Sequence, residues 1–247
     1  MFLAIKEMKF AKLRYSLIIG IMFLISFVVF LLSGLANGLA TEFSEVIDRW
    51  DAGRIVLSEE SNGVLVASQL TIDDLSEVKT SEKAPLALYS GSVEIAGEKE
   101  NLSFFGTQPE AFFLPELTEG KSFNEKNEVI ISQALADAGL AIGDTITIGS
   151  QGVEVIVTGI FPKTSYVVTP VMYGSIEAVV ETKFGSDFLA AQTNYPMNAI
   201  LTEETDPIIE NKAFQSLSTE EFIAQLPGYA EQNLTLNAMI YFLFMIA

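Results

Sequence analysis

The sequence predicts an α+β membrane protein with three parts: an N-terminal transmembrane helix, a mixed α/β domain outside the membrane, and the beginning of a second transmembrane helix. Three observations predict it. Leu17–Ala36 contains no charged residue, residues 41–231 alternate between short helix and strand patterns, and Ala238–Ala247 is wholly apolar. The chain is 49% hydrophobic with a mean hydropathy of +0.37. It is therefore too apolar for an ordinary soluble domain and too charged for a membrane bundle alone.

The first transmembrane helix is predicted over residues 15–40. Twenty apolar residues rise by about 30 Å, the thickness of a hydrocarbon core. A cleaved signal peptide is the alternative, but its apolar region runs only about 7–15 residues. A cut after Ala40 would also place Asn37 where a small residue is needed. Basic residues precede the span and acidic residues dominate after it, which predicts a cytoplasmic N-terminus. The basic residues are Lys6, Lys9, Lys12 and Arg14.

Two further patterns flank this span. Residues 1–14 mix apolar with basic side chains, which predicts either a cytoplasmic amphipathic segment on the inner leaflet or a simple basic flank. Gly34 and Gly38 form a G-x-x-x-G spacing, which lets two helices approach closely. We therefore expect these glycines to mark a helix-packing face.

The charge of the remaining chain excludes several classes of function. From residue 42 onward there are 31 acidic and 10 basic residues, a net charge of −21, so nucleic acid is excluded as an expected partner. Cysteine and histidine are both absent, which removes disulfides, Cys metal clusters, the commonest metal ligand and the commonest general base. We expect no metal site and no intrinsic cofactor.

Residues 41–231 are predicted to form one mixed extracytoplasmic domain. The first helix is expected to continue to about Asp51, because Gly53 then breaks the helical pattern. Strands are predicted at Arg54–Leu57, Leu86–Ile95, Asn101–Phe105, Glu128–Ile131, Thr145–Ile148, Val153–Ile160 and Ala199–Thr202. Short helices are predicted at Thr71–Lys79, Ser132–Gly139, Ser175–Thr182 and Ser218–Pro227. Thr71 and Ser132 are N-cap residues, and Ser218 with Glu221 forms a capping box.

The C-terminal residues 232–247 end in ten apolar residues, which cover only about 15 Å. Either they form a buried core helix, or they are the beginning of a second transmembrane helix that is truncated. A soluble domain with such a tail would expose an aggregation-prone segment, so the sequence favours the truncated helix.

One run of residues in the domain carries a recognisable signature. It comprises Gly120, Phe123, Glu128–Ser132, Leu135, Ala136, Leu140, Gly143, Asp144, Ile146, Val153, Val155, Val157, Gly159 and Ile160. This run resembles the periplasmic core domain of MacB-type, FtsX-like ABC transporter permeases. Within that family, Met1–Lys9, Lys12–Ile18 and Asp48–Trp50 look like the permease subunit of Gram-positive haem (hemin) exporters.

This resemblance implies a transport function without chemistry in the chain itself. Such permeases have one helix, a large outer domain and three more helices. They work as homodimers with two cytoplasmic ABC ATPase subunits, whose ATP-driven closure is transmitted to the outer domains. The chain has no G-x-x-x-x-G-K-[ST] motif, so ATP hydrolysis is expected in the partner and not here.

If haem is the transported ligand, its contacts are expected close to the membrane. With His and Cys absent, Tyr and Met are the remaining common axial ligands. Phe43 and Trp50 follow the first span, and Tyr229 precedes the apolar C-terminal run. Tyr166 follows the hairpin that is predicted from the strands Thr145–Ile148 and Val153–Ile160. We therefore name Phe43, Trp50, Tyr166 and Tyr229 as haem-binding candidates. The alternative for each is structural, because Trp and Tyr at span ends commonly anchor helices at the interface and Tyr166 fits ordinary strand packing.

Three other functions remain open at this stage. A permease of the same architecture can handle peptides or lipoproteins, and FtsX-like proteins regulate cell-wall hydrolases. A singly anchored binding protein would require the C-terminal run to be core. An enzyme is least favoured, because the sequence shows no catalytic constellation.

Overall fold

The computed structural model describes residues 11–226 apart from Ala96, together with Tyr229, Leu234, Ala238 and Tyr241. Residues 1–10 of the predicted amphipathic segment, and most of 232–247, lie outside the described residues. Contacts divide the chain into one unit of residues 1–41 and 228–247 and a second unit of residues 42–227.

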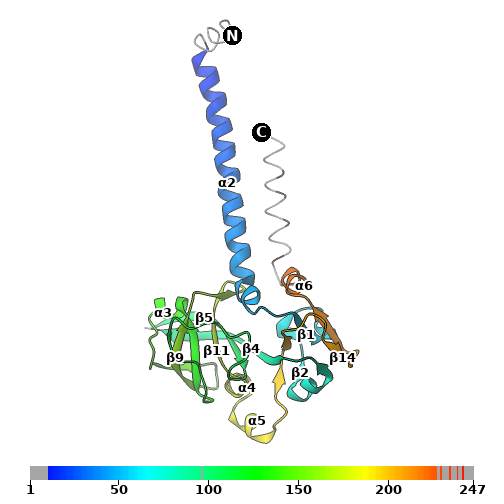
Figure 1. Ribbon diagram of the computed structural model, residues 1–247. Helices are drawn as coiled ribbons and strands as arrows, with labels where there is room; N and C mark the ends of the chain where they lie inside the picture. The colour runs from blue at the N-terminus through cyan, green and yellow to red at the C-terminus, as the bar shows by residue number, and fades with distance from the viewer. Residues whose placement is uncertain are drawn as a thin grey trace. The chain divides into compact units, whose positions relative to one another are not determined.

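A single uninterrupted helix, α2 (Lys12–Arg49), contains 38 residues (Figure 1). Its part from Lys12 to Leu35 is long and apolar enough to cross a membrane, and only 6% of its most apolar window is buried. Exposed apolar side chains such as Phe30, at 77%, suit contact with lipid. Gly34 and Gly38 have no atom within 4 Å of where a Cβ would lie, so their role in helix packing stays a prediction.

The end of α2 agrees with the prediction. Asp51 adopts a left-handed backbone with φ 48°, two residues after the helix ends at Arg49. At Gly53 an added Cβ would lie 2.4 Å from the backbone oxygen of Glu203, so only glycine fits there.

Six strands of the domain close into a ring. Each strand pairs with the next in the order β4, β5, β11, β7, β9, β8, and β8 pairs back to β4 through Val93 and Ile148. The strands are β4 (Lys83–Ile95), β5 (Glu98–Thr107), β7 (Glu128–Ser132), β8 (Thr145–Ile148), β9 (Val153–Phe161) and β11 (Thr169–Ser175). The pairs β5–β11 and β7–β9 are parallel and the others antiparallel. Ring closure leaves these strands few free edges.

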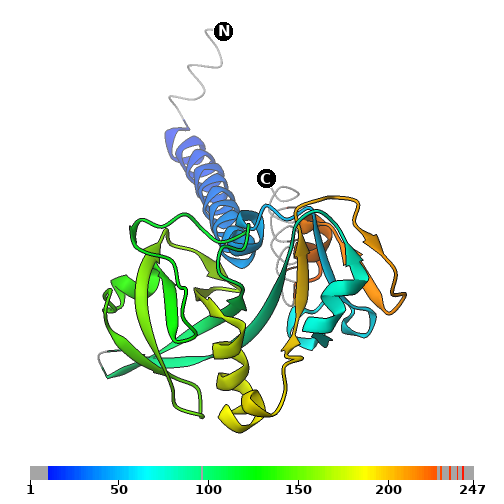
Figure 2. The same ribbon diagram turned by 60° about the horizontal axis from the view of Figure 1, so that its bottom comes forward.

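A second group of strands extends from the first half of β4. β13 (Ala199–Thr202) pairs with β4, β1 (Arg54–Ser58) pairs with β13, and β15 (Phe214–Leu217) pairs with β1, all antiparallel. Figure 2 shows the ring and this second group side by side, joined by the long strand β4. β4 therefore belongs to both halves of the domain.

The remaining elements are short and lie around these strands. The short strands are β2 (Leu70–Thr71), β3 (Val78–Lys79), β6 (Glu119–Gly120), β10 (Ser165–Tyr166), β12 (Pro196–Met197) and β14 (Ile208–Ile209). The helices are η1 (Glu59–Ser61), η2 (Leu65–Ala67), η3 (Ile72–Glu77), α3 (Gln133–Asp137), α4 (Ile176–Phe184), α5 (Ser186–Ala191) and α6 (Thr219–Ala224). The α+β class predicted from the sequence is confirmed.

Serine side chains begin three of these helices. At the start of α3, the Ser132 hydroxyl accepts a hydrogen bond from the Ala134 N–H. Ser175 accepts in the same way from Ala178 at the start of α4, and Ser218 accepts from Glu221 at the start of α6. The predicted capping box of Ser218 is confirmed, because the Glu221 carboxylate accepts in return from the Ser218 N–H at 2.8 Å.

The helix predicted over Thr71–Lys79 is wrong in type and length. The chain forms the 3₁₀ helix η3 and then enters β3 at Val78, where it pairs with β14. The N-cap at Thr71 is correct, since its N–H donates to Asp74 Oδ2 at 2.7 Å. The pairing of β3 with a strand far along the chain is a tertiary contact that overrides local helix preference.

The carboxylate of Glu128 organises the turn before β7. It accepts from the backbone N–H groups of Asn124 at 2.8 Å and Glu125 at 3.2 Å and lies 3.4 Å from Lys121 Nζ. These backbone hydrogen bonds, together with the charge of Lys121, hold the pKa of Glu128 below its ordinary value of about 4.3.

We expect this interaction to make the domain acid-sensitive. Because the folded pKa is depressed, the stabilisation is complete above the unfolded pKa and is lost as the pH falls through the folded pKa. Urea unfolding at a series of pH values, followed by fluorescence of the single tryptophan, measures it. Glu128→Gln should flatten this acid limb, whereas the exposed Glu98→Gln should leave it unchanged. An identical acid limb in Glu128→Gln would contradict the prediction.

Candidate functional site

The outer end of α2 is bound to one loop of the domain by a ladder of hydrogen bonds. Three positions of the helix, spread over nearly two turns, contact three positions of the loop in reverse order. The bonds are Arg49 Nη2 to the Lys163 carbonyl (3.3 Å), the Ser165 N–H to Glu45 Oε2 (3.2 Å), and the Val167 N–H to the Phe43 carbonyl (3.3 Å). Arg49 and Glu45 are also paired with each other at 2.9 Å. The loop therefore runs up the helix from Arg49 toward Phe43.

Below the ladder, Trp50 is enclosed in an aromatic cluster. We define the aromatic cluster as Trp50, Phe105, Phe113, Phe161, Tyr166 and Tyr173. The Trp50 indole is 0% exposed, and its Nε1–H donates to Tyr173 Oη at 3.0 Å. Trp50 and Tyr166 both pack edge-on against Phe105, with ring centroids 5.6 and 5.4 Å apart. Such edge-to-face pairs stabilise beyond their buried area.

Burial keeps both tyrosines of the cluster in the neutral phenol form. It raises the pKa of Tyr166 well above its ordinary value. Burial also raises the pKa of Tyr173, although the hydrogen bond from Trp50 opposes this in part. A phenolate at Tyr166 would therefore require the side chain to become exposed first.

The two residues after Tyr166 have a strained backbone. Val167 and Val168, with φ of 47° and 69°, form the turn between β10 and β11. A two-residue hairpin turn with both φ positive normally takes Asn or Gly, and a β-branched residue there costs about 1–2 kcal/mol. The turn is held by the ladder at Val167 and by Thr169, whose hydroxyl donates to the Tyr166 carbonyl at 2.8 Å.

An apolar groove of about 620 Å³ lies beside this turn. Tyr166, Val167, Leu88 and Leu102 form part of its wall, and its lining is mainly apolar. The polar groups in the same lining come from Ser90, Ser92, Asn101, Ser103 and Thr169. A groove of this size and character suits a largely apolar ligand with a few polar groups.

Comparison with known proteins identifies the family to which this domain belongs. Residues 16–201 match the family model described as the MacB-like periplasmic core domain. The chain belongs to this family. The expected resemblance is thereby confirmed over most of the chain.

Proteins similar to this MacB-like chain are named as permeases. A Staphylococcus haemolyticus protein named as a hemin transport system permease, HrtB, is 26% identical over 245 residues, covering 99% of this chain and 68% of the relative. An uncharacterized ABC transporter permease of Mycobacterium tuberculosis is 26% identical over 170 residues, covering 67% of this chain and 47% of the relative. The crystal structure of the periplasmic region of MacB from Actinobacillus actinomycetemcomitans aligns with a TM-score of 0.51 at 15% identity, covering 69% of this chain and 91% of that structure. This last similarity supports the fold of the domain.

The MacB-like domain brings three of the four haem-binding candidates together. The Phe43 carbonyl accepts from the residue after Tyr166, and Trp50 and Tyr166 share Phe105 as a packing partner. Tyr229 belongs to the other unit and is half-buried there. Their role as ligand contacts stays a prediction.

Sequence reasoning missed several residues of this site. Phe105 and Tyr173 are central to the cluster, and Glu45 and Arg49 form the ladder. The i, i+4 spacing of Glu45 and Arg49 was a visible signal for an ion pair. Nothing in the sequence indicated that Tyr173 would meet Trp50, because the two are 123 residues apart.

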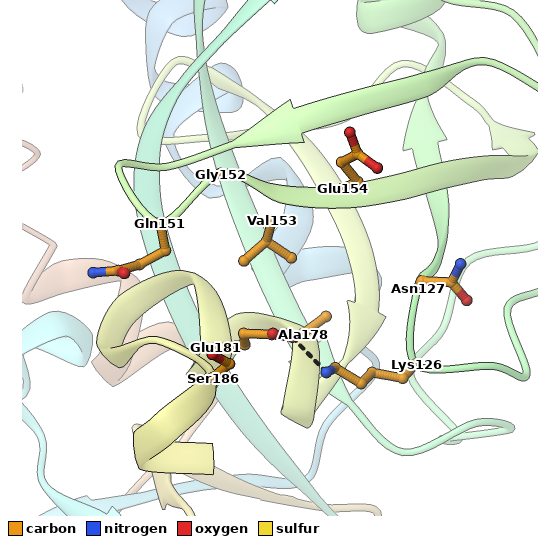
Figure 3. Close-up of a pocket in the computed structure, with 9 residues that line it drawn as sticks. All are labelled: Lys126, Asn127, Gln151, Gly152, Val153, Glu154, Ala178, Glu181 and Ser186. Atoms are coloured by element: carbon orange, nitrogen blue, oxygen red, sulfur yellow. Dashed lines mark ion pairs between the residues drawn. The ribbon is translucent and has the colours of Figure 1, made fainter. Parts of the chain in front are cut away.

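A second pocket of the MacB-like domain is polar and has a different character. It has a volume of about 470 Å³ and lies at the tip of the β8–β9 hairpin, beside α4 (Figure 3). Lys126 and Glu181 pair across it at 2.5 Å, which joins the segment before β7 to α4. Within the described residues, no group of three or more acidic side chains is placed to hold a metal ion. This pocket is therefore a polar surface cleft that is bridged by an ion pair.

Proposed function

We propose that this chain is the membrane-spanning subunit of an ABC transporter that moves haem across or out of the cell membrane, driven by a separate ATPase. Two findings support the proposal. The family match covers residues 16–201, and a relative named for hemin transport aligns over 99% of the chain. ATP hydrolysis is assigned to the partner because the sequence has no phosphate-binding loop.

The proposed assembly follows from the same resemblance. The N-terminus lies in the cytoplasm, residues 41–231 form the extracytoplasmic domain, and the intact protein crosses the membrane more than once. Two permease copies form a homodimer with two ATPase subunits. Gly34 and Gly38 have open space around them, which leaves room for the close approach of a second helix.

The observation that carries the mechanism is the continuity of α2. One helix runs without a break from the apolar span to the ladder at Phe43, Glu45 and Arg49. It ends at Arg49, directly before the buried Trp50. A tilt of this helix in the membrane would therefore act directly on the loop that carries Tyr166. ATP-driven movement of the span would in this way change access to the groove.

The haem contacts are proposed at Phe43, Trp50, Tyr166 and Tyr229. The groove beside Tyr166 is apolar and of ligand size, which suits a flat apolar ring with polar edges. In the described conformation Tyr166 is 7% exposed and its phenol is neutral. We therefore propose that the iron meets Tyr166 only after the ladder opens.

Absorbance titration of haem into the purified chain in detergent tests this proposal. We expect a saturable Soret shift that weakens about tenfold or more in Tyr166→Phe combined with Tyr229→Phe, since a lost iron ligand costs well over 1 kcal/mol. Tyr195→Phe, at a half-buried tyrosine outside the candidate site, is the matched control. A saturable shift unchanged in the double variant would reject these ligands and keep haem as the cargo. The absence of any saturable shift in a folded sample would favour a permease for peptides or lipoproteins.

A further inference from the structure

One edge of strand β4 has a gap in its strand pairing. β5 pairs with Ala87–Ile95 along the opposite edge. The edge with the gap pairs with β13 up to Leu86 and with β8 at Val93. Between Leu86 and Val93 no described strand pairs with this edge, so other groups must satisfy its backbone.

Two side chains bind the backbone of Leu88 in this gap. Asn198 Oδ1 accepts from the Leu88 N–H at 2.7 Å, and Lys183 Nζ donates to the Leu88 carbonyl at 3.2 Å. Both side chains also line a pocket of about 560 Å³, which therefore lies at the gap. We call it the Lys183 pocket. Its lining includes Val66, Leu70, Lys183, Phe184, Met197 and Asn198.

Lys183 is the only charged residue among the described residues that line this pocket. Its ammonium group has three N–H donors, one of which goes to Leu88, and it lies 5.6 Å from the centre of the Phe184 ring. Lys183 forms no ion pair with any residue that the structure describes. Burial lowers the pKa of Lys183, because part of the charge is removed from water without a carboxylate beside it. A ligand carboxylate would supply this missing partner.

The other walls of the Lys183 pocket are largely apolar. Leu70 and Met197 are each 2% exposed and lie opposite each other in the β2–β12 pair. Val66 and Phe184 are 62% and 44% exposed, so they leave apolar surface open to a ligand. One cation among apolar side chains suits a molecule with one carboxylate and a long apolar body.

We propose that the Lys183 pocket binds a long-chain fatty acid, whose carboxylate pairs with Lys183 and whose acyl chain lies against Val66, Phe184 and Met197. The pocket shares Val66 with the groove beside Tyr166. Binding of the fatty acid does not depend on the identity of the transported cargo.

Photolabelling of the full chain in lipid nanodiscs tests this proposal. A palmitic acid analogue with a diazirine near the end of its acyl chain is irradiated with the protein, and mass spectrometry identifies the labelled residues. Unlabelled palmitic acid and hexadecanol are added as competitors, since hexadecanol has the same chain without the carboxylate. Lys183→Met removes the charge and Lys183→Arg keeps it. Lys99→Met is the matched control, because it removes the charge of an exposed lysine on β5.

The label is expected at Val66, Phe184 or Met197, and excess palmitic acid should block it while hexadecanol should not. Lys183→Met should lower this labelling about tenfold, the factor expected for the loss of a charge-assisted hydrogen bond. Lys183→Arg and Lys99→Met should retain it. Near-UV circular dichroism checks that each variant is folded, and the hexadecanol comparison decides without any variant.

Three results would overturn the proposal. The first is labelling that is confined to residues outside the Lys183 pocket. The second is equal competition by hexadecanol and palmitic acid, because it would show that no carboxylate is recognised. The third is unchanged labelling in a folded Lys183→Met variant, which would leave Lys183 with only its structural bond to Leu88.

Discussion

Replacing Asn198 with alanine is expected to lower the free energy of unfolding of the outer domain by about 3–5 kcal/mol. The Asn198 side chain is 3% exposed and binds three backbone groups. It accepts from the Leu88 N–H at 2.7 Å and donates to the carbonyls of Leu65 and Ser68 at 3.1 and 3.2 Å. Alanine leaves all three groups unpaired, and each buried unpaired group costs about 1–3 kcal/mol. Urea unfolding followed by the fluorescence of Trp50 measures the loss.

Asn194→Ala is the control for this variant. Asn194 makes one exposed hydrogen bond, from the Asp73 N–H at 3.0 Å, so its removal should cost less than about 1 kcal/mol. Equal losses in the two variants would show that Asn198 does not hold β4, β13 and the η2 segment together. A large loss confined to Asn198→Ala would support that role.

The second large effect is expected at Trp50. Trp50→Ala should destabilise the domain by about 3–5 kcal/mol, because it empties the centre of the aromatic cluster and removes the hydrogen bond to Tyr173. Urea unfolding followed by circular dichroism measures it, since the variant has no tryptophan. Trp50→Phe keeps an aromatic ring and should cost less, leaving mainly the lost hydrogen bond and the smaller ring. A loss below about 1 kcal/mol in Trp50→Ala would contradict the packing described for the end of α2.

The sequence predicted best those elements whose signals are local. The strands of the β4–β5 and β8–β9 hairpins and the caps at Ser132 and Ser218 depend on residues close together in the chain, and these were predicted. Strand β11 was missed. It begins with Thr169-Pro170 and contains Gly174, which normally indicate a turn. Here Gly174 allows the close packing of Phe104 and Val129, 3.0 Å from where a Cβ would lie.

Contacts between residues far apart in the chain could not be predicted from the sequence pattern. Ring closure depends on parallel pairing of β5 with β11, whose partners are more than 60 residues apart. The sequence pattern predicted that Phe43, Trp50 and Tyr166 lie near the membrane, and the structure brings these three residues together. The sequence did not indicate the hydrogen bond between Trp50 and Tyr173 or the left-handed turn at Val167, because both depend on how distant segments pack.

Haem titration into lipid nanodiscs tests the central proposal most directly. Nanodiscs that hold the chain are compared with empty nanodiscs of the same lipids, and the Soret absorbance is recorded at each haem concentration. A transporter subunit for haem predicts a saturable component at a fixed ratio of haem to protein, above the linear partition of haem into lipid. A strictly linear response, equal in loaded and empty nanodiscs, would contradict a role in haem transport.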